Sequence, residues 1–373
     1  MKSSKFRKLI EPIFKKGGIT IDGNEPYDIQ VHDDRLYKRI FTHGNLGLGE
    51  AYMDKWWDVE KLDEFFYRIL RFGLDKEVGK SWVKVFSDIQ SFFLNMQNRL
   101  RSRVVIKQHY DIGNDLYMSF LDPYNQYTCG YFKDTEDLDQ AQRNKLDLIC
   151  KKLELKESDK VLDIGCGWGG FMKYASENYG CHVTGITISD QQIRHAKELC
   201  GNLPVEIKKM DYRDLSSKFD KILICGMIEH VGYKNYRRIM KIVHKSLKDS
   251  GRFLLHTIGN KVSARSTDPW ISKYIFPNSL LPSMKQISQA AEGLFVMEDW
   301  QNFGAYYDHT LMAWYDNFKR NWDDIKSRYD ERFFRMWKYY LLSCAGTFRA
   351  RENQLWQIVF TPKGLPGVVD YLR

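Results

Sequence analysis

The second half of the chain alternates short apolar runs with amphipathic stretches. Beyond residue 155 the apolar runs are KVLDIG, HVTGITI, VEIKKM, KILICGM and RFLLHTI, and stretches with helical spacing such as SDQQIRHAKELC separate them. This alternation is typical of β-α-β units, in which consecutive strands pair in parallel and helices cover both faces of the sheet. The run LWQIVF near the C-terminus is expected to close the sheet, after the stretch from Gly259 to Phe303 has interrupted it.

The first of these strands leads into VLDIGCGWGG, which has the form of a nucleotide-binding loop. Its glycines satisfy GxGxxG at Gly165, Gly167 and Gly170. A dinucleotide also needs an acid at the end of the second strand, about 20 residues further on, but that strand ends TGITIS. Asp163 and the additional Gly169 instead favour S-adenosylmethionine, because a carboxylate attracts its cationic amino group and repels a pyrophosphate. The pattern predicts a Rossmann-like class I methyltransferase domain, an α/β fold with a mostly parallel seven-stranded sheet and helices on both faces.

We predict two domains. Residues 1–103 form a small, mainly helical N-terminal domain for lipid docking or dimer contact, and residues 104–373 form the catalytic domain. The stretch from Lys76 to Arg103 lacks proline and has apolar residues at helical spacing, so it is predicted to be a connecting helix. SKFRKLIEPIFKKG is amphipathic and basic, which fits a helix on a membrane surface or one docked on its own domain. We favour docking, because the segment is short and Pro12 interrupts it.

The net charge of +9 draws the protein toward polyanions, either nucleic acid or anionic lipid. Nucleic acid is the weaker candidate, because LDPY lacks the second proline of a D/N-P-P-Y loop and no nucleic-acid recognition module is present. The seven cysteines are scattered and never spaced as CxxC, so neither a metal site nor a disulfide framework is predicted. With no apolar stretch near the roughly 18 residues of a spanning helix, we expect a soluble, cytoplasmic protein.

One glycine-rich segment near the N-terminus needs its own interpretation. GNLGLGEAYMDKWW lacks the lysine of a phosphate loop and follows no obvious strand. We therefore predict a turn that leads into a helix.

Several segments together resemble one family. QHYDIGNDLY, DPYNQYTCGYF, VLDIGCGWGG, GITIS, MIEHVG, LLHTIG, DPWISKYIFPN and TLMAWY resemble the successive motifs of cyclopropane-fatty-acyl-phospholipid synthases, in their order and along nearly the whole chain. GLGEAYMDKWW is similar to the bacterial phospholipid-acting branch of that family. The resemblance implies transfer of a methylene group from S-adenosylmethionine to the cis double bond of unsaturated acyl chains in membrane phospholipids, which forms a cyclopropane ring.

The resemblance also implies how the ring closes. Methyl transfer leaves a carbocation, which must lose a proton from the new methyl group in a pocket without water. In the family the base is a bound bicarbonate ion. The resemblance places this ion against the side chains of Glu229, His256 and Tyr307 and against main-chain groups near Cys129 and Ile258. Glu229 would draw the proton toward itself while the other side chains orient the ion, and the nearby tyrosine rings would face the positive charge.

The cofactor contacts are likewise carried over from the family. The methionine end falls to Tyr127, Thr128, Asp163, Gly165 and Gly167, the ribose to Thr187 and Gln192, and the adenine to Tyr212. Simpler roles compete with some of these, since a surface turn explains Tyr212 equally well. Cys344, in SCAGTFRAR, also matches the family and is included among the catalytic residues, but burial of a small apolar side chain competes with a reactive role for it and for Cys129. A satisfied histidine in the core competes with a catalytic role for His256, although the carboxyl ends of parallel strands are where ligands bind.

The partners follow from the same resemblance. The substrate is an acyl chain still esterified in a bilayer, so we expect a cytoplasmic enzyme, peripherally associated with the inner face of the membrane, and a homodimer as is common in the family. The basic surface suits anionic headgroups. A related lipid C-methyltransferase without ring closure stays open as an alternative, and a nucleic-acid methyltransferase is less favoured.

Overall fold

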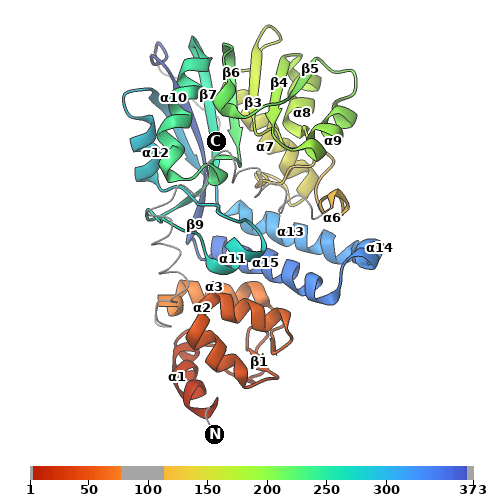
Figure 1. Cartoon of the computed structure of the whole chain (residues 1–373), viewed down its shortest axis with the longest axis vertical. Helices are drawn as coiled ribbons and strands as arrows, with labels where there is room; N and C mark the ends of the chain where they lie inside the picture. The colour runs from red at the N-terminus through yellow and green to blue at the C-terminus, as the bar shows by residue number, and fades with distance from the viewer. Residues whose placement is uncertain (1–2, 77–112, 368–373) are drawn as a thin grey trace. The chain divides into compact units, whose positions relative to one another are not determined.

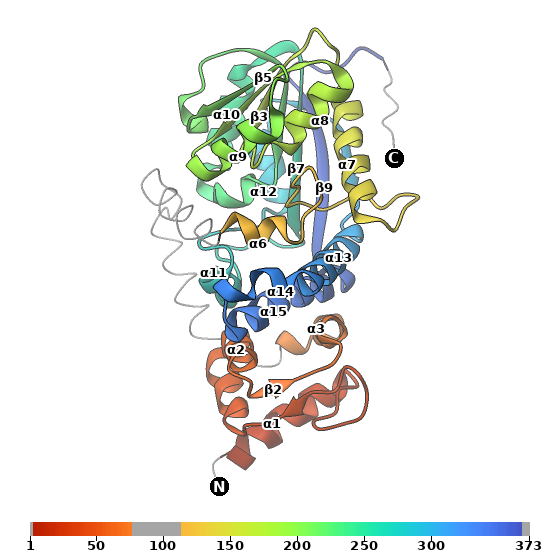
Figure 2. The same cartoon turned by 90° about the vertical axis from the view of Figure 1, so that its right-hand side faces the viewer.

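The computed structural model describes residues 3–76 and 113–367, which form two compact units (Figures 1 and 2). The first unit combines residues 3–76 with Arg265–Ser279 and Tyr307–Asn353. The second combines residues 113–264, Leu280–Tyr306 and residues 354–367. Two segments of the first unit thus come from the region that the sequence analysis assigned to the catalytic domain. The predicted connecting helix lies, beyond Lys76, outside the described residues, and the predicted domain boundary after residue 103 stays a prediction.

The second unit is built on a seven-stranded sheet, as predicted. Its strands are β3 (Lys160–Ile164), β4 (His182–Thr187), β5 (Val205–Lys209), β6 (Phe219–Cys225), β7 (Leu247–Asn260), β8 (Val296–Asn302) and β9 (Asn353–Thr361). Their order is β5-β4-β3-β6-β7-β9-β8. Neighbours from β5 to β7 pair in parallel, and β8 pairs antiparallel with β9. The reversal of strand order beside β3 is where open α/β sheets bind their ligands.

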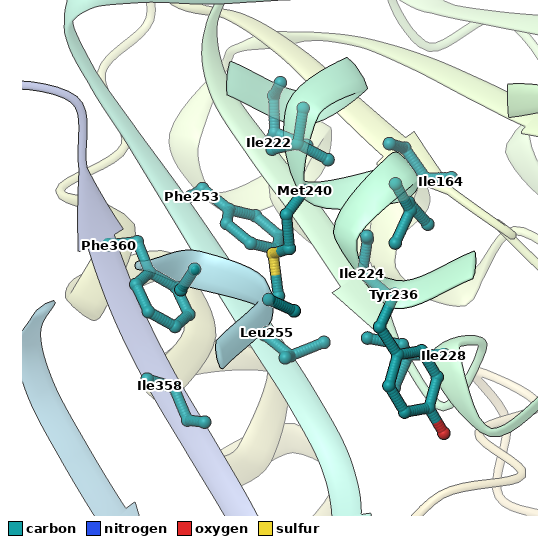
Figure 3. Close-up of a cluster of buried hydrophobic side chains, with 14 of the residues drawn as sticks. Ile164, Ile222, Ile224, Ile228, Tyr236, Met240, Phe253, Leu255, Ile358 and Phe360 are labelled. Carbon is teal, nitrogen blue, oxygen red and sulfur yellow. The ribbon is translucent and has the colours of Figure 1, made fainter. Parts of the chain in front are cut away.

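Helices cover both faces of this sheet (Figure 1). One face carries α7 (Leu138–Leu153), α8 (Gly170–Tyr179) and α9 (Asp190–Cys200), and the other carries α10 (Tyr236–Ser246) and α12 (Met284–Ala291). Successive strand residues alternate between the two faces. Figure 3 shows the core beneath α10, where strand residues such as Ile222, Phe253 and Phe360 surround Met240.

The first unit is mainly helical. Its helices are α1 (Ser3–Lys16), α2 (Arg35–Met53), α3 (Leu62–Arg71), α11 (Pro269–Tyr274), α13 (Tyr306–Arg320), α14 (Trp322–Ile325) and α15 (Glu331–Arg349), and β1 (Gln30–Val31) pairs with β2 (Trp57–Asp58). α15 packs closely against α3, since a Cβ added to Gly346 would lie 2.5 Å from the carbonyl oxygen of Asp63. The remaining described elements are α6 (Asn114–Met118) and the 3-10 turns η1 (Leu74–Lys76), η2 (Tyr212–Asp214), η3 (Ile228–His230), η4 (Tyr233–Asn235) and η5 (Lys326–Arg328).

Two predictions for the N-terminal region are confirmed. α1 docks on its own unit through Ile10 and Phe14, which are buried. The predicted turn leading into a helix is confirmed in the glycine-rich segment, because the helical backbone of α2 breaks at Gly44, with φ of 56°, and then continues to Met53. Gly49 lies within α2, and a Cβ there would be 2.5 Å from the ring of Trp270, so glycine at this position permits close packing of that ring.

The sheet also contains a strand that the sequence analysis did not recognise. β8 lies within the stretch that was expected only to interrupt the sheet. It forms one edge, and β9 is inserted between β7 and β8 instead of closing the sheet from outside. The strand was not recognised because its sequence, VMEDWQN, has no long apolar run. An edge strand keeps polar and partly exposed positions.

Candidate functional site

The predicted cofactor residues follow four adjacent parallel strands of the second unit. Asp163 lies in β3 and the glycine loop follows it, whereas Thr187 ends β4. Tyr212 follows β5 in η2, and Glu229 follows β6 in η3. Because these strands are parallel and adjacent, their carboxyl ends meet at one edge of the sheet. The structure therefore brings together, at one edge, residues that are far apart in the sequence.

The loop after β3 needs glycine for its backbone. Gly165, Gly167 and Gly169 have φ of 83°, 54° and 93°, in the left-handed region that favours glycine. They differ in their surroundings. An added Cβ would lie 2.7 Å from Met227 at Gly165 and 3.0 Å from Ala196 at Gly169, but it would meet no described atom within 4 Å at Gly167. The loop therefore presents open space at Gly167, where a ligand can approach the backbone.

Asp163 is a buried carboxylate with an unusual acidity. Its side chain is 2% exposed. Burial raises its pKa to about 7, and the positive charge of Lys145 opposes that rise. A cation that binds beside a buried carboxylate stabilises its ionised form, because the cation replaces the solvation that burial removed. The chemistry of this position fits the amino group of an amino-acid ligand.

The loop that contains Tyr127 and Thr128 is fixed by helix α7. Lys145 donates to the hydroxyl of Thr128 over 3.0 Å and also to the side-chain oxygen of Gln126. The side chain of Gln142 donates to the carbonyl oxygen of Thr128 over 2.8 Å. Lys145 is fully buried, which lowers its pKa. The ammonium group and the amide together determine where Thr128 lies.

The candidates for the ribose and adenine form two local groups. The hydroxyl of Thr187 donates to the side-chain oxygen of Gln192 over 2.7 Å, and both residues are buried. Tyr212 is partly buried, which raises the pKa of its phenol. The guanidinium carbon of Arg213 lies 5.2 Å from the centroid of the tyrosine ring and Arg213 donates to Asp211 over 2.9 Å. These contacts fix both groups at the same sheet edge.

Glu229 and His256 are two buried titratable side chains with unused polar atoms. One carboxyl oxygen of Glu229 accepts from the main-chain N–H of Ile258 over 2.8 Å. The other, Oε2, and Nε2 of His256 are buried and have no hydrogen-bond partner among the described residues. Burial raises the pKa of Glu229 and lowers that of His256 well below its usual value. Two such atoms are suited to a small polar ligand, because buried polar groups are normally satisfied.

One side of His256 faces a cluster of aromatic rings. Its ring lies 5.9 Å from that of Phe303, which packs 5.3 Å from Tyr131. Tyr306 lies 5.6 Å from Tyr131 and 6.5 Å from Phe303. An apolar wall of this kind lowers the local dielectric constant and presents negative ring faces to a cation.

The other predicted residues are placed as follows. Cys129 is fully buried and its thiol donates to the carbonyl oxygen of Gly130 over 3.2 Å. Tyr307 and Cys344 belong to the first unit, where the ring of Tyr307 packs 4.4 Å from that of Phe348. Burial raises the pKa of Cys344 to about 12, so its thiol stays protonated at neutral pH and is a poor nucleophile.

Two residues beside the site were missed from the sequence. Lys145 lies on the buried side of α7, and Gln357 lies in the otherwise apolar run LWQIVF. Each had a signal in the sequence. A lysine at a core position of an amphipathic helix is destabilising unless it has a hydrogen-bonding partner, and so is a glutamine inside an apolar strand.

The fold and this sheet edge define a class of protein. A Rossmann-like α/β fold, an acidic residue before a glycine loop and a buried site beside it are the features of a class I S-adenosylmethionine-dependent methyltransferase. Residues 97–358 match the family model "Mycolic acid cyclopropane synthetase". The chain belongs to this family.

Known relatives agree with the assignment. The chain is 49% identical over 366 residues to the cyclopropane-fatty-acyl-phospholipid synthase of Escherichia coli, which covers 98% of this chain and 95% of the relative. It is 33% identical over 287 residues to a sphingolipid C9-methyltransferase of Komagataella phaffii, covering 71% and 59%. Among solved structures, a mycolic acid cyclopropane synthase complexed with SAH and CTAB is 30% identical, with a TM-score of 0.63 and coverage of 69% and 97%. The predicted enzyme class and fold are confirmed.

Proposed function

We propose that this enzyme transfers a methylene group from S-adenosylmethionine to the cis double bond of unsaturated phospholipid acyl chains and closes a cyclopropane ring. The match to the Escherichia coli synthase along nearly the whole of both chains supports the substrate class. The single observation that carries the ring-closing step is the pair of buried, unpartnered atoms, Oε2 of Glu229 and Nε2 of His256, beside an aromatic wall.

The residues at the ends of β3 to β6 fit the cofactor. S-adenosylmethionine, when bound, supplies the methyl carbon that becomes the ring CH₂. The carboxyl group of Asp163 binds the amino group of the cofactor, and the open space at Gly167 lets the cofactor approach the backbone. Thr128, which Lys145 holds in place by a hydrogen bond, contacts the methionine end. Thr187 and Gln192 bind the ribose, and Tyr212 lies against the adenine. The buried carboxylate supports these roles, because burying it is costly unless a ligand or partner compensates it. The glycine loop supports them because it leaves open space at Gly167.

Ring closure needs a base in a dry pocket. Bicarbonate, when bound, supplies the base that removes a proton from the new methyl group. The raised pKa of Glu229 suits a carboxyl group that takes up this proton or shares it with the ion. His256 orients the ion, whereas Cys129 and Ile258 line its site through the main chain. The N–H of Ile258 already binds Glu229, so this amide also holds the carboxyl group in place.

The lipid must be reached at a membrane surface. We propose peripheral association with the inner face of the cytoplasmic membrane as a homodimer. The net charge of +9 supports attraction to anionic headgroups. In the first unit, Leu9 and Phe41 are 47% and 53% exposed, and α1 also carries exposed lysines. No helix among the described residues has the length and apolar character needed to cross a bilayer.

The proposal is tested by product analysis. The purified protein is incubated with S-adenosylmethionine and vesicles of cis-monounsaturated phospholipid, and the acyl chains are analysed by mass and proton resonance. We expect a gain of one CH₂, loss of olefinic protons and appearance of ring protons. An unchanged acyl chain, with cofactor binding confirmed by calorimetry, would refute the lipid assignment.

The same assay separates a second function. Relatives at 30% to 33% identity include sphingolipid C9-methyltransferases and a tuberculostearic acid methyltransferase, which makes methylation without ring closure the alternative. A gain of the same mass without ring protons would establish this alternative.

A further inference from the structure

A row of polar side chains crosses the sheet beside the proposed anion site. Cys225 on β6 pairs in register with His256 on β7, and Gln357 on β9 pairs with Gln301 on β8. β9 lies between β7 and β8, so the row spans four adjacent strands. His256 and Gln357 are 1% and 0% exposed. Burying a glutamine side chain lowers the stability of the fold unless its amide forms hydrogen bonds.

His256 and Gln357 point to the same face of the sheet. Leu254 and Val359 belong to the core cluster beneath α7 and α8. Because side chains alternate along a strand, residues two positions away lie on that face as well. The two side chains therefore meet between the sheet and α7, and their nearest polar atoms, Nε2 of Gln357 and Nδ1 of His256, are 3.3 Å apart.

In this contact the amide nitrogen of Gln357 faces Nδ1 of His256, while its Oε1 is buried and has no hydrogen-bond partner among the described residues. With the amide in this orientation the nitrogen donates, so Nδ1 of His256 accepts. A neutral imidazole that accepts at Nδ1 carries its proton on Nε2. Nε2 is the atom that is buried without a partner among the described residues.

We propose that Gln357 is a positioning residue that holds His256 as the Nε2–H tautomer, so that His256 donates a hydrogen bond to the reaction's base. The inference rests on the proposed function, because it assigns a direction to one contact of the proposed anion. In this tautomer Nε2 cannot accept a proton, so His256 orients the anion and is not itself the base. The proton then passes to the anion and to Oε2 of Glu229, which is also buried without a hydrogen-bond partner among the described residues.

The surroundings of His256 keep the imidazole neutral, which the tautomer requires. Burial lowers its pKa, and so do the positive charges of Lys145 and Lys152 on α7. Lys152 is paired with Asp299 over 2.8 Å inside the protein. A protonated imidazole would donate at both nitrogens and would lose the contact with the amide of Gln357.

The tautomer is measured directly by nitrogen resonance of protein labelled in its imidazole rings. The chain has nine histidines, and the signals of His256 are identified by their loss in His256→Asn. In the unaltered enzyme we expect a protonated-type shift at Nε2 and an unprotonated-type shift at Nδ1. In Gln357→Leu we expect this preference to disappear, and in Gln357→Glu we expect a proton on Nδ1, because a carboxylate accepts there.

Kinetics on unsaturated phospholipid vesicles provide the second readout. We expect Gln357→Leu to lower kcat by about 10- to 100-fold, as loss of a tautomer-fixing partner does for ligand histidines, with unchanged affinity for S-adenosylmethionine. The matched control is Gln301→Leu, which removes a buried amide from the neighbouring strand and should keep the tautomer of His256.

The outcomes separate the two proposals. A proton on Nδ1 in the unaltered enzyme, or an unchanged tautomer in Gln357→Leu, would overturn the role of Gln357 even if cyclopropane forms. The expected tautomers with no product from the unaltered enzyme would instead refute the proposed function and leave the positioning of His256 established.

Discussion

A substitution at Gly167 should weaken cofactor binding more than it destabilises the fold. In Gly167→Ala the new methyl group meets no described atom within 4 Å, so the substitution causes no clash inside the protein. The backbone at this position has φ of 54°. An alanine held in the left-handed region costs about 1–2 kcal/mol, which corresponds to a fall of a few degrees in Tm for a domain of this size.

The effect on cofactor binding should be larger. If S-adenosylmethionine lies against this backbone, the methyl group occupies part of its place, and forcing an extra methyl into a fitted contact costs about 1–3 kcal/mol. We therefore expect the Kd measured by calorimetry to rise by about 5- to 150-fold.

A matched control separates strain from obstruction. Gly293, which follows α12, has φ of 67°, and an added Cβ there also meets nothing described within 4 Å. Gly293→Ala should lower Tm comparably and leave the Kd unchanged. Equal affinity of Gly167→Ala and the unaltered enzyme would refute the assignment of this loop, and so would an equal loss of affinity in both variants.

Three further predictions test the buried groups. Since burial raises the pKa of Asp163 to about 7 and Lys145 opposes this, affinity for S-adenosylmethionine should increase as pH rises through about 7 and the carboxylate forms. Lys145→Met should move that midpoint to higher pH in calorimetry, and an unmoved midpoint would contradict the coupling. Glu229→Gln should lower kcat by about 10²- to 10⁴-fold with unchanged cofactor affinity, and a parallel loss of both would indicate a structural role. Met240→Ala should lower the free energy of unfolding by about 2–5 kcal/mol in urea titrations, because Met240 is fully buried beneath α10, whereas a loss below 1 kcal/mol would contradict the packing in Figure 3.

Local signals were sufficient to predict the cofactor edge of the sheet. Alternating apolar runs predict parallel strands, and the glycine loop and Asp163 occur within ten consecutive residues. Their meeting point then follows from the general geometry of such sheets. The predicted fold is confirmed because each step depended on residues close together in the sequence, whereas the cofactor contacts stay a prediction.

The remaining parts of the site depend on contacts that no local pattern encodes. A lysine in a helix is expected at the surface, so the burial of Lys145 beside Thr128 becomes visible only when α7 is placed on the sheet. Gln357 meets His256 because β9 is inserted beside β7, about one hundred residues later in the chain. β8 was missed for a similar reason, since strand pairing and not periodicity defines it.

The interleaved path of the chain has a consequence for synthesis on the ribosome. The first unit needs α15, which ends at Arg349, before α3 gains its packing partner, and the sheet of the second unit needs β9, which ends at Thr361. Neither unit can therefore fold completely until almost all of the chain has been translated. Incomplete chains expose the apolar side of α3 and the unpaired margin of β7 together, and such surfaces are prone to aggregation. A stop codon before residue 331 therefore removes both α15 and β9, and with them an element that each unit needs.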